Sequence, residues 1–247
     1  SGRPVKMMMD RDEVFRASGP ASAARLTVKV GGKKDGTITA MQTSIAYEAG
    51  AFKGSPAMIG GMTAFTPYNC PNVYCETFDV VVNKPKVAAY RAPGAPQAEF
   101  GAEMAVSELA EKLGIDPVDL RLQNAAKEGT QTVYGPKLKA VGLVECLEAA
   151  KNSPHYKTEL KEGEGRGIAS GFWFNIGGQS SVTINMNPDG TGTIVEGSPD
   201  IGGSRASMQM MAAEELGIPL NDLKPIIGDT ESIPYNQSTG GSRTTFA

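Results

Sequence analysis

The spacing of hydrophobic residues predicts an alternation of strands and helices. Apolar side chains recur at every second position over 24–30 and again over 37–42, with a glycine-rich turn between the two stretches. This alternation is typical of a β-hairpin and predicts two antiparallel strands within 24–49. A further strand is expected at 74–83, where valine, tyrosine and phenylalanine are frequent. Residues 48–72 are rich in glycine, proline, methionine and alanine, which predicts a long irregular segment.

Three helices are expected next. A stripe of apolar residues at helical spacing predicts a helix over 97–113, and Gly114 suits the position that ends it. Asp116 followed by Pro117 is typical of the cap and first turn of a second helix. A third helix is expected over 143–151.

A charged, glycine-containing stretch at 156–166 is expected to be a linker, and the pattern restarts beyond it. A turn is predicted at Asn187-Pro188-Asp189-Gly190. Four strands and one helix are expected in this half, with the strands at 167–174, 180–186, 192–196 and 223–227 and the helix at 204–216. We therefore predict an α+β fold of two mixed α/β subdomains, 1–160 and 161–247, each of which runs hairpin, glycine-rich loop, helix.

Composition and charge narrow the class of protein. Of the 247 residues 40% are hydrophobic and 21% are charged, so a packed core is expected. The net charge is −3 and like charges form no block, which argues against nucleic acid or an anionic membrane as partner. No apolar run approaches the length of a membrane span, and the first residues lack the apolar core of a signal peptide. We expect a cytoplasmic protein.

Few residues are suited to bind a metal. The three cysteines, Cys70, Cys75 and Cys146, are too few and too irregularly spaced for a disulfide framework or an iron–sulfur cluster, so reduced thiols are expected. The single histidine, His155, argues against a zinc site and against a Ser-His-Asp triad. The acidic run from Asp10 to Glu13 is interpreted as a solvated edge at a strand-to-loop transition. No metal-binding residue is predicted.

Two glycine-containing loops lead into predicted helices. In the loop 89–97 the backbone N–H groups and the planar guanidinium of Arg91 suit a phosphate or an oxo group, although a plain turn with a surface arginine has the same pattern. In the loop 200–207 the pair Gly202 and Gly203 allows a ligand to approach the backbone, and Ser204 is a candidate helix cap. An ordinary strand–helix connection is the alternative for this second loop.

A third loop, 238–245, is dense in glycine and small hydroxyl residues. It contains Gly241, Ser242, Arg243 and Thr244, a composition that suits a phosphate or a polar heterocycle. The alternative is a flexible tail. The loop matches neither a Walker A sequence nor a dinucleotide fingerprint.

Together these stretches resemble the molybdenum hydroxylase family, which includes xanthine dehydrogenase and aldehyde oxidoreductase. The matching stretches, in the family's order and spacing, are Gly2-Arg3-Pro4-Val5-Lys6 with Asp10-Arg11-Asp12-Glu13, Tyr90-Arg91 through Pro96-Gln97, Ile201-Gly202-Gly203 through Glu214 to Pro219, Gly228-Asp229-Thr230 through Pro234, and Thr239 through Thr244. The resemblance spans nearly the whole chain. It identifies the chain as an internal fragment of the large, molybdenum-cofactor-binding subunit.

The resemblance implies a fold and a chemistry. Residues 1–160 would be the C-terminal portion of the first molybdopterin-binding subdomain, and residues 161–247 would be the N-terminal portion of the second. The family hydroxylates a small-molecule substrate with a molybdopterin cofactor, of which the cytosine dinucleotide is one form. Electrons would leave through iron–sulfur and FAD groups on partner chains or domains.

The resemblance also implies roles for individual residues. Arg91 would lie beside the molybdenum centre. The pterin and its phosphates would be held by Ile201, Gly202, Gly203, Gly241, Ser242, Arg243 and Thr244. The family's early cofactor loop would precede residue 1 and its general-base glutamate would lie beyond residue 247, so no catalytic base is assigned here. The isolated chain is expected to be inactive.

Three departures from the family pattern bear on substrate and cofactor. Gly203 stands where many members have glutamine, which would remove one pterin contact. Ala92 stands where the carbon monoxide dehydrogenases have cysteine, which argues against that activity. The arginine that binds purines would fall near Ile59, so an aldehyde or an N-heteroaromatic compound is the expected substrate.

Two other functions stay open at this point. The chain could be a cofactor-free binding or assembly module of the same fold, or an unrelated binder of a phosphate ligand. A homodimer is a further expectation, because a fragment with half a cofactor pocket exposes apolar surface.

Overall fold

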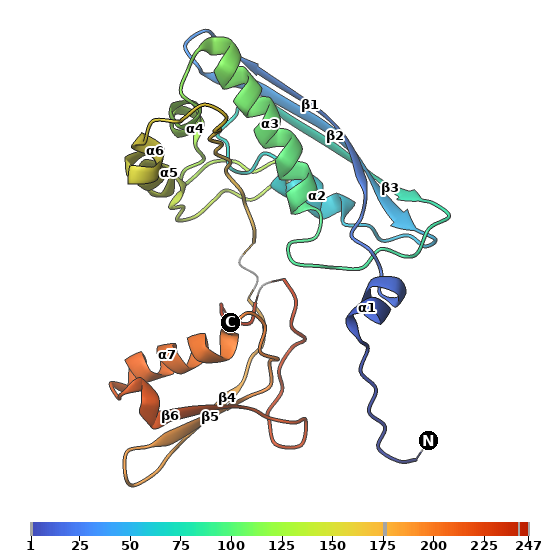
Figure 1. Cartoon of the computed structure of the whole chain (residues 1–247), viewed down its shortest axis with the longest axis vertical. Coiled ribbons are helices and arrows are strands. Elements are labelled where there is room, and N and C mark those ends of the chain that lie inside the picture. Colours follow the sequence, from blue (N-terminus) through green and yellow to red (C-terminus); the bar gives the residue numbers. More distant parts are fainter. Residues whose placement is uncertain (1, 175–176, 242, 247) are drawn as a thin grey trace. The chain divides into compact units, whose positions relative to one another are not determined.

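The computed structural model describes residues 2–174, 177–241 and 243–246. Contacts divide the chain into two compact units, unit 1 (Ser1–Trp173) and unit 2 (Phe174–Ala247) (Figure 1). Each unit has a three-stranded sheet in which the first two strands pair antiparallel and the last two pair parallel. The predicted mixed α/β architecture is therefore confirmed.

The sheet of unit 1 contains the predicted hairpin and the predicted third strand. Its strands, in spatial order, are β1 (Ala24–Gly32), β2 (Ile38–Gly50) and β3 (Val73–Val81). Strand β2 is longer than its alternating stretch suggested, and Met41, Ile45 and Tyr47 on its inner face are at most 1% exposed. The hairpin joins β1 to β2, whereas the parallel pair β2–β3 needs a crossover connection.

That crossover contains a helix, α2 (Ala57–Thr63), in the segment that we expected to be irregular. The expectation was wrong because small residues let this helix lie directly on the sheet. A Cβ atom on Gly60 would lie 2.1 Å from Tyr47 Oη, and one on Gly61 would lie 2.9 Å from the Thr77 methyl. The glycines are therefore required by packing.

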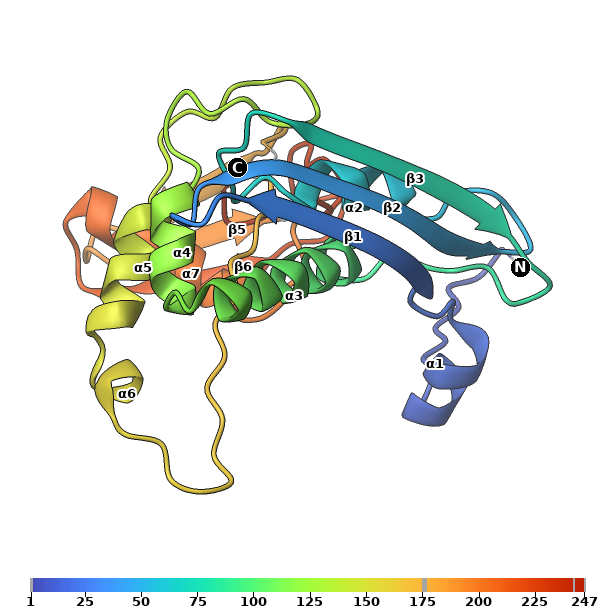
Figure 2. The ribbon, with the colours of Figure 1, turned by 90° about the horizontal axis from the view of Figure 1, so that it is seen from above.

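A long helix, α3 (Ala95–Leu113), lies along β1 and covers the inner face of the sheet (Figure 2). Its buried alanines form a flat face, and a Cβ on Gly101 would lie 3.2 Å from both Leu26 and Val28. Gly114 ends the helix in the left-handed conformation, as predicted. The remaining helices of this unit are α4 (Pro117–Asn124), α5 (Leu143–Asn152) and α6 (Pro154–Lys157).

The acidic run near the N-terminus begins a short helix, α1 (Arg11–Ala17), and does not form a strand edge. The Asp10 carboxylate accepts the Glu13 N–H at 2.8 Å, and the Glu13 carboxylate accepts the Asp10 N–H at 2.9 Å. This reciprocal pair is a capping box. Asp12 forms an exposed ion pair with Arg16.

A buried ion pair joins α3 to α4. The Arg121 guanidinium is fully buried and donates to the Glu103 carboxylate at 2.8 Å. Arg121 also donates to Ser107 Oγ at 2.9 Å, and the Tyr68 hydroxyl donates to Glu103. All of these partners belong to unit 1. The buried ion pair stabilises this unit only when both charges and their hydrogen-bond partners are present, because removal of one partner leaves a buried charge uncompensated.

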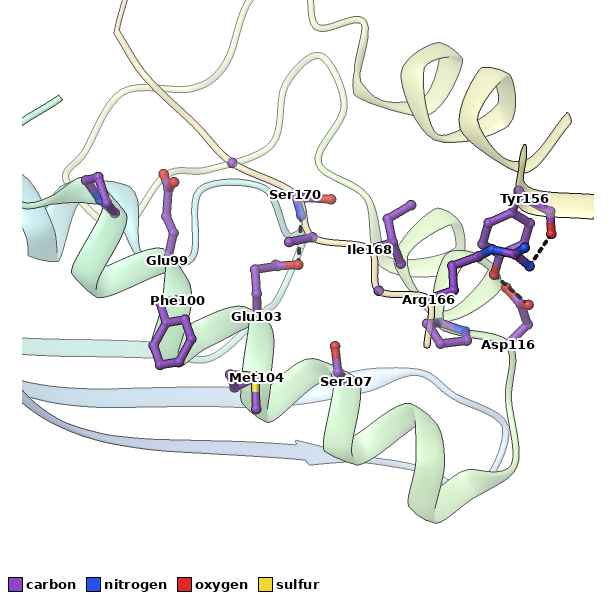
Figure 3. A pocket seen from close by; sticks show the side chains of 15 residues that line it. Glu99, Phe100, Glu103, Met104, Ser107, Asp116, Tyr156, Arg166, Ile168 and Ser170 are labelled. Atoms are coloured by element: carbon purple, nitrogen blue, oxygen red, sulfur yellow. Dashed lines mark hydrogen bonds between the residues drawn. The ribbon is translucent and has the colours of Figure 1, made fainter. Parts of the chain in front are cut away.

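The segment after α6 lies against α3 instead of forming the predicted strand at 167–174. The Ser170 N–H donates to Glu103 Oε2 at 2.7 Å (Figure 3). The Phe172 N–H donates to Glu99 Oε1 at 2.8 Å. The backbone is extended here, but its N–H groups bind carboxylates and not another strand. The boundary between the two compact units therefore lies after Trp173 in the sequence. The assignment of 1–160 and 161–247 to two family subdomains stays a prediction.

Unit 2 follows the predicted order closely. Its elements are β4 (Val182–Met186), β5 (Gly192–Glu196), α7 (Ser204–Leu216), the 3-10 turn Leu220–Asp222 and β6 (Leu223–Ile227). Gly190 takes positive φ in the β4–β5 turn. Helix α7 packs through Ala213 on a small core with Ile194 and Leu223.

Replacing Arg121 tests the buried ion pair. Arg121→Met is expected to lower the free energy of unfolding by about 3–5 kcal/mol, because it leaves the Glu103 carboxylate buried without its cation. The measurement is urea unfolding followed by circular dichroism. Arg16→Met, in the exposed pair with Asp12, is the control and is expected to change little. Equal effects of the two substitutions would contradict the account.

Glu99 should make stability depend on pH. Burial raises the pKa of Glu99 from 4.5 to about 7, and the Phe172 N–H bond opposes the shift. Because the folded state binds this proton more tightly than the unfolded state, Glu99 contributes to stability when it is protonated. Its contribution to the free energy of unfolding is complete below pH 4.5 and is lost as the pH rises through 7. The unfolding free energy of the wild type, relative to Glu99→Gln, should therefore be lower at pH 7.5 than at pH 4.5. Glu108→Gln, on the exposed side of α3, is the control; a Glu99→Gln difference independent of pH would refute the assignment.

Candidate functional site

The Arg91 loop is fixed by two hydrogen bonds within the loop and one from strand β2. It connects β3 to α3, and the Tyr90 hydroxyl donates to Gln97 Oε1 at 2.6 Å across it. The Gly94 N–H donates to the Tyr90 hydroxyl at 3.3 Å, and the Tyr47 hydroxyl donates to the Gly94 carbonyl at 2.7 Å. Burial raises the pKa of Tyr47, which keeps this hydroxyl a neutral donor. The Arg91 side chain is exposed, so the loop presents a guanidinium from a fixed backbone.

The residue after Arg91 is conformationally strained. Ala92 has φ 55°, the one positive value for a residue other than glycine in the described part of the chain. A left-handed alanine costs roughly 1–2 kcal/mol. Such outliers concentrate at functional sites, where the surrounding structure enforces them.

This loop lies at the carboxyl edge of the parallel pair β2–β3. The chain leaves both strands at that edge, and the two connections are tied together there: Lys86 Nζ donates to the Gly54 carbonyl at 2.9 Å. Carboxyl edges of parallel strands are frequent ligand sites, because the loops that follow converge on them.

Unit 2 repeats the arrangement. Strands β5 and β6 are parallel, and the Gly228 N–H donates to the Glu196 carbonyl at 2.8 Å where both strands end. The loop with Ile201, Gly202 and Gly203 follows β5, and the loop with Gly241, Arg243 and Thr244 follows β6. Two of the three predicted loops therefore leave one edge of one sheet. Ser242 lies outside the described residues.

The first loop of unit 2 exposes its backbone. Gly202 and Gly203 have φ of 64° and 84°, and a Cβ on either would meet no atom within 4 Å. Ser204 is not the cap that we expected: Gly203 occupies the N-cap position, and Ser204 Oγ instead accepts the Ile201 N–H at 3.3 Å. The Asp200 carboxylate accepts the Arg205 N–H at 3.2 Å.

The second loop of unit 2 is anchored by Arg243. This side chain is 2% exposed and donates to the carbonyls of Gln237 and Gln179 at 2.8 Å each, and to Ser180 Oγ. In this structure the Arg243 guanidinium makes hydrogen bonds within unit 2, so its role as a cofactor contact stays a prediction. By contrast, the Thr244 hydroxyl is buried and has no hydrogen-bond partner among the described residues.

These observations decide which residues fit a molybdopterin. Open glycine backbones and an orphaned buried hydroxyl suit a ligand rich in hydrogen-bonding groups and phosphate. Gly202, Gly203 and Thr244 therefore have groups free to bind such a ligand. The exposed guanidinium of Arg91, in unit 1, is a further group of suitable chemistry. Within the described ranges, no three histidine, cysteine or acidic side chains converge on a point that could hold a metal ion.

A cavity of about 720 Å³ lies between α3 and the extended segment 166–171 of unit 1 (Figure 3). Phe100 and Met104 form its apolar wall, and Glu99 and Glu103 face it from the same side of α3. Sequence reasoning missed these carboxylates, although their spacing of four places them on one helix face. Both carboxylates accept backbone N–H groups of the extended segment, so they hold this segment against α3.

No helix in the described part of the chain is both long and apolar enough to span a membrane.

Comparisons with known proteins agree with the geometry. Residues 1–125 and 139–247 each match a family model described as a molybdopterin cofactor-binding domain. A putative xanthine dehydrogenase molybdenum-binding subunit of Escherichia coli is 30% identical over 266 residues, which cover 99% of this chain and 35% of the relative. The nicotinate dehydrogenase large molybdopterin subunit of Eubacterium barkeri is 36% identical over 153 residues, which cover 60% of this chain and 36% of the relative.

Solved structures show the same fold. The aldehyde oxidoreductase of Desulfovibrio desulfuricans superposes with a TM-score of 0.73 at 27% identity, over 92% of this chain and 27% of that one. Quinoline 2-oxidoreductase of Pseudomonas putida superposes with a TM-score of 0.80 at 21% identity, over 96% of this chain and 34% of that one. The chain thus spans about a third of the length of its relatives. Because the first family model alone covers half of the chain, the protein belongs to the molybdopterin cofactor-binding domain family, with molybdenum-binding subunits of the xanthine dehydrogenase and aldehyde oxidoreductase type as its homologues.

Proposed function

We propose that this chain is part of the large subunit of a molybdopterin-dependent oxidoreductase that hydroxylates an aldehyde or an N-heteroaromatic substrate. The observation that carries the proposal is the placement of the glycine-rich loops at the carboxyl edges of parallel strands, in a chain whose two halves both match cofactor-binding models. Residues 1–247 alone are proposed to be inactive, because no residue among them is assigned as general base.

The substrate class is supported by the site residues and by the names of the relatives. Ile59 is an apolar residue in α2, at the position where the family's purine-binding arginine is expected. The relatives include an aldehyde oxidoreductase, a quinoline oxidoreductase and a nicotinate dehydrogenase. An uncharged aldehyde or heteroaromatic ring is compatible with an apolar side chain at this point.

The cofactor, when bound, supplies the redox centre for two-electron oxidation of the substrate. Arg91 would lie beside that centre, where its guanidinium would supply hydrogen-bond donors and positive charge. The backbone N–H groups around Gly202 and Gly203 and the Thr244 hydroxyl bind the pterin and its phosphates. Gly241, Ser242, Arg243 and Ile201 complete this set in our proposal.

Electron transfer requires partners. We propose iron–sulfur and FAD groups on other chains or domains, the cytosine dinucleotide as one form of the cofactor, and a homodimeric large subunit. A cytoplasmic location is supported by the three cysteines, which are free thiols.

Replacing Arg91 tests its proposed role in the assembled enzyme. Arg91→Met in the full-length subunit with its partners should lower kcat/KM for an aldehyde or quinoline on the order of 10²-fold, because an oriented donor is lost. The molybdenum content should be unchanged. Arg25→Met, an exposed arginine on β1, is the control for loss of a surface charge. Full activity of Arg91→Met with a dye acceptor would reject the role.

Thr244→Val separates cofactor binding from folding. The hydroxyl has no partner within the described residues, so its removal should not lower the unfolding temperature. Loss of one hydrogen bond, about 1 kcal/mol, should weaken cofactor affinity about fivefold, measured as molybdenum retained on dialysis. Thr245→Val, next to it and exposed, is the control. Wild-type retention by Thr244→Val would remove this residue from the site.

A further inference from the structure

One face of β4 is apolar and uncovered. Val182, Ile184 and Met186 are 50%, 41% and 46% exposed. They stand opposite Glu196, Ile194 and Gly192 of β5, and opposed residues of a strand pair point to the same side of the sheet. Ile194 lies in the core beneath α7, so the apolar face of β4 is on the helix-covered side.

The alternation along β4 indicates that this face is built for burial. Thr183 and Asn185 are polar and point to the opposite side of the sheet. Val182, Ile184 and Met186, which alternate with them, are apolar. A strand exposed on both faces has no reason to separate apolar from polar side chains. Helix α7 packs on β6 and leaves this row of β4 exposed.

Unit 1 contains the same topology with the cover present. Its β1 occupies the place of β4, paired antiparallel to the central strand, while β3 pairs parallel to that strand on its other side. Leu26 and Val28, on the inner face of β1, are half-buried beneath α3. Helix α3 directly follows β3 and the Arg91 loop.

Unit 2 has the counterparts of all these elements except α3. Strands β4, β5 and β6 match β1, β2 and β3; α7 matches α2 as the crossover helix; and the loop with Gly241 and Arg243 matches the Arg91 loop. Among the described residues, no helix follows β6. The uncovered row on β4 is the surface that such a helix would occupy.

We propose that the apolar face of β4 is the docking site for one amphipathic helix of the same large subunit, seated on β4 as α3 is seated on β1. This inference rests on the proposal that the chain is part of a longer subunit, and the relative from Escherichia coli is about three times as long as this chain. The helix presents small apolar residues to the strand, like Ala98 and Ala102 of α3. Its first turn follows a glycine-rich loop, so both units direct a helix N-terminus towards the carboxyl edge of their sheet.

Site-specific photo-crosslinking in the assembled full-length enzyme tests the inference. A diazirine amino acid replaces Ile184 in one variant and Thr183, on the opposite face, in a matched control. After irradiation, mass spectrometry identifies the peptides joined to each probe. We expect the Ile184 probe to join residues three or four apart in one helix of the same polypeptide, and the Thr183 probe to yield none of these products.

The other outcomes would overturn the inference. Crosslinks from Ile184 to a second copy of the chain or to a partner subunit would assign the face to an oligomeric interface. Reaction with solvent alone would show that the face is free. Molybdenum content and activity of the same samples report separately on the proposed function, so an active enzyme with an uncovered β4 rejects only the docking site.

Discussion

Parallel pairing of two strands determines where the loops of this protein lie. A parallel pair cannot be closed by a tight turn, so the chain must return over the sheet before the second strand begins. In unit 1 this return contains α2, and in unit 2 it contains α7. Both strands of each pair then end at the same edge, and the glycine-rich loops leave from it. Both candidate cofactor loops of unit 2 follow strands that end at this edge, although 38 positions separate Gly203 from Gly241.

Much of the fold could be predicted because local chemistry and long-range packing agree. Helix α7 and strand β6 have the predicted bounds, since a glycine stands at each end of the helix and Pro219 lies in the turn that separates the helix from the strand. The hairpin of β1 and β2 follows from its alternation. Direct pairing of β2 with β3 could not be predicted, because no local pattern specifies which distant strand is parallel to which.

The errors have physical causes. Glycine and methionine made α2 resemble a loop, yet Gly60 is required where the helix contacts the Tyr47 hydroxyl. The stretch 167–174 has the composition of a strand and is extended, but Glu99 and Glu103 accept the hydrogen bonds that a neighbouring strand would otherwise make. In the site, glycine positions could be read from the sequence. The burial of Arg243 could not, because it depends on hydrogen bonds to Gln179, Ser180 and Gln237. Nor could the burial of the Thr244 hydroxyl, which has no hydrogen-bond partner among the described residues.

The central claim is that the loops at the carboxyl edge of the β5–β6 pair bind the pterin cofactor. Hydrogen–deuterium exchange on the full-length subunit, with and without molybdopterin, measures this most directly. Cofactor should slow the exchange of the backbone amides at 201–205 and 240–245, and leave the β4–β5 turn at 187–191 unchanged. Equal exchange of the two loops in both forms would contradict the account.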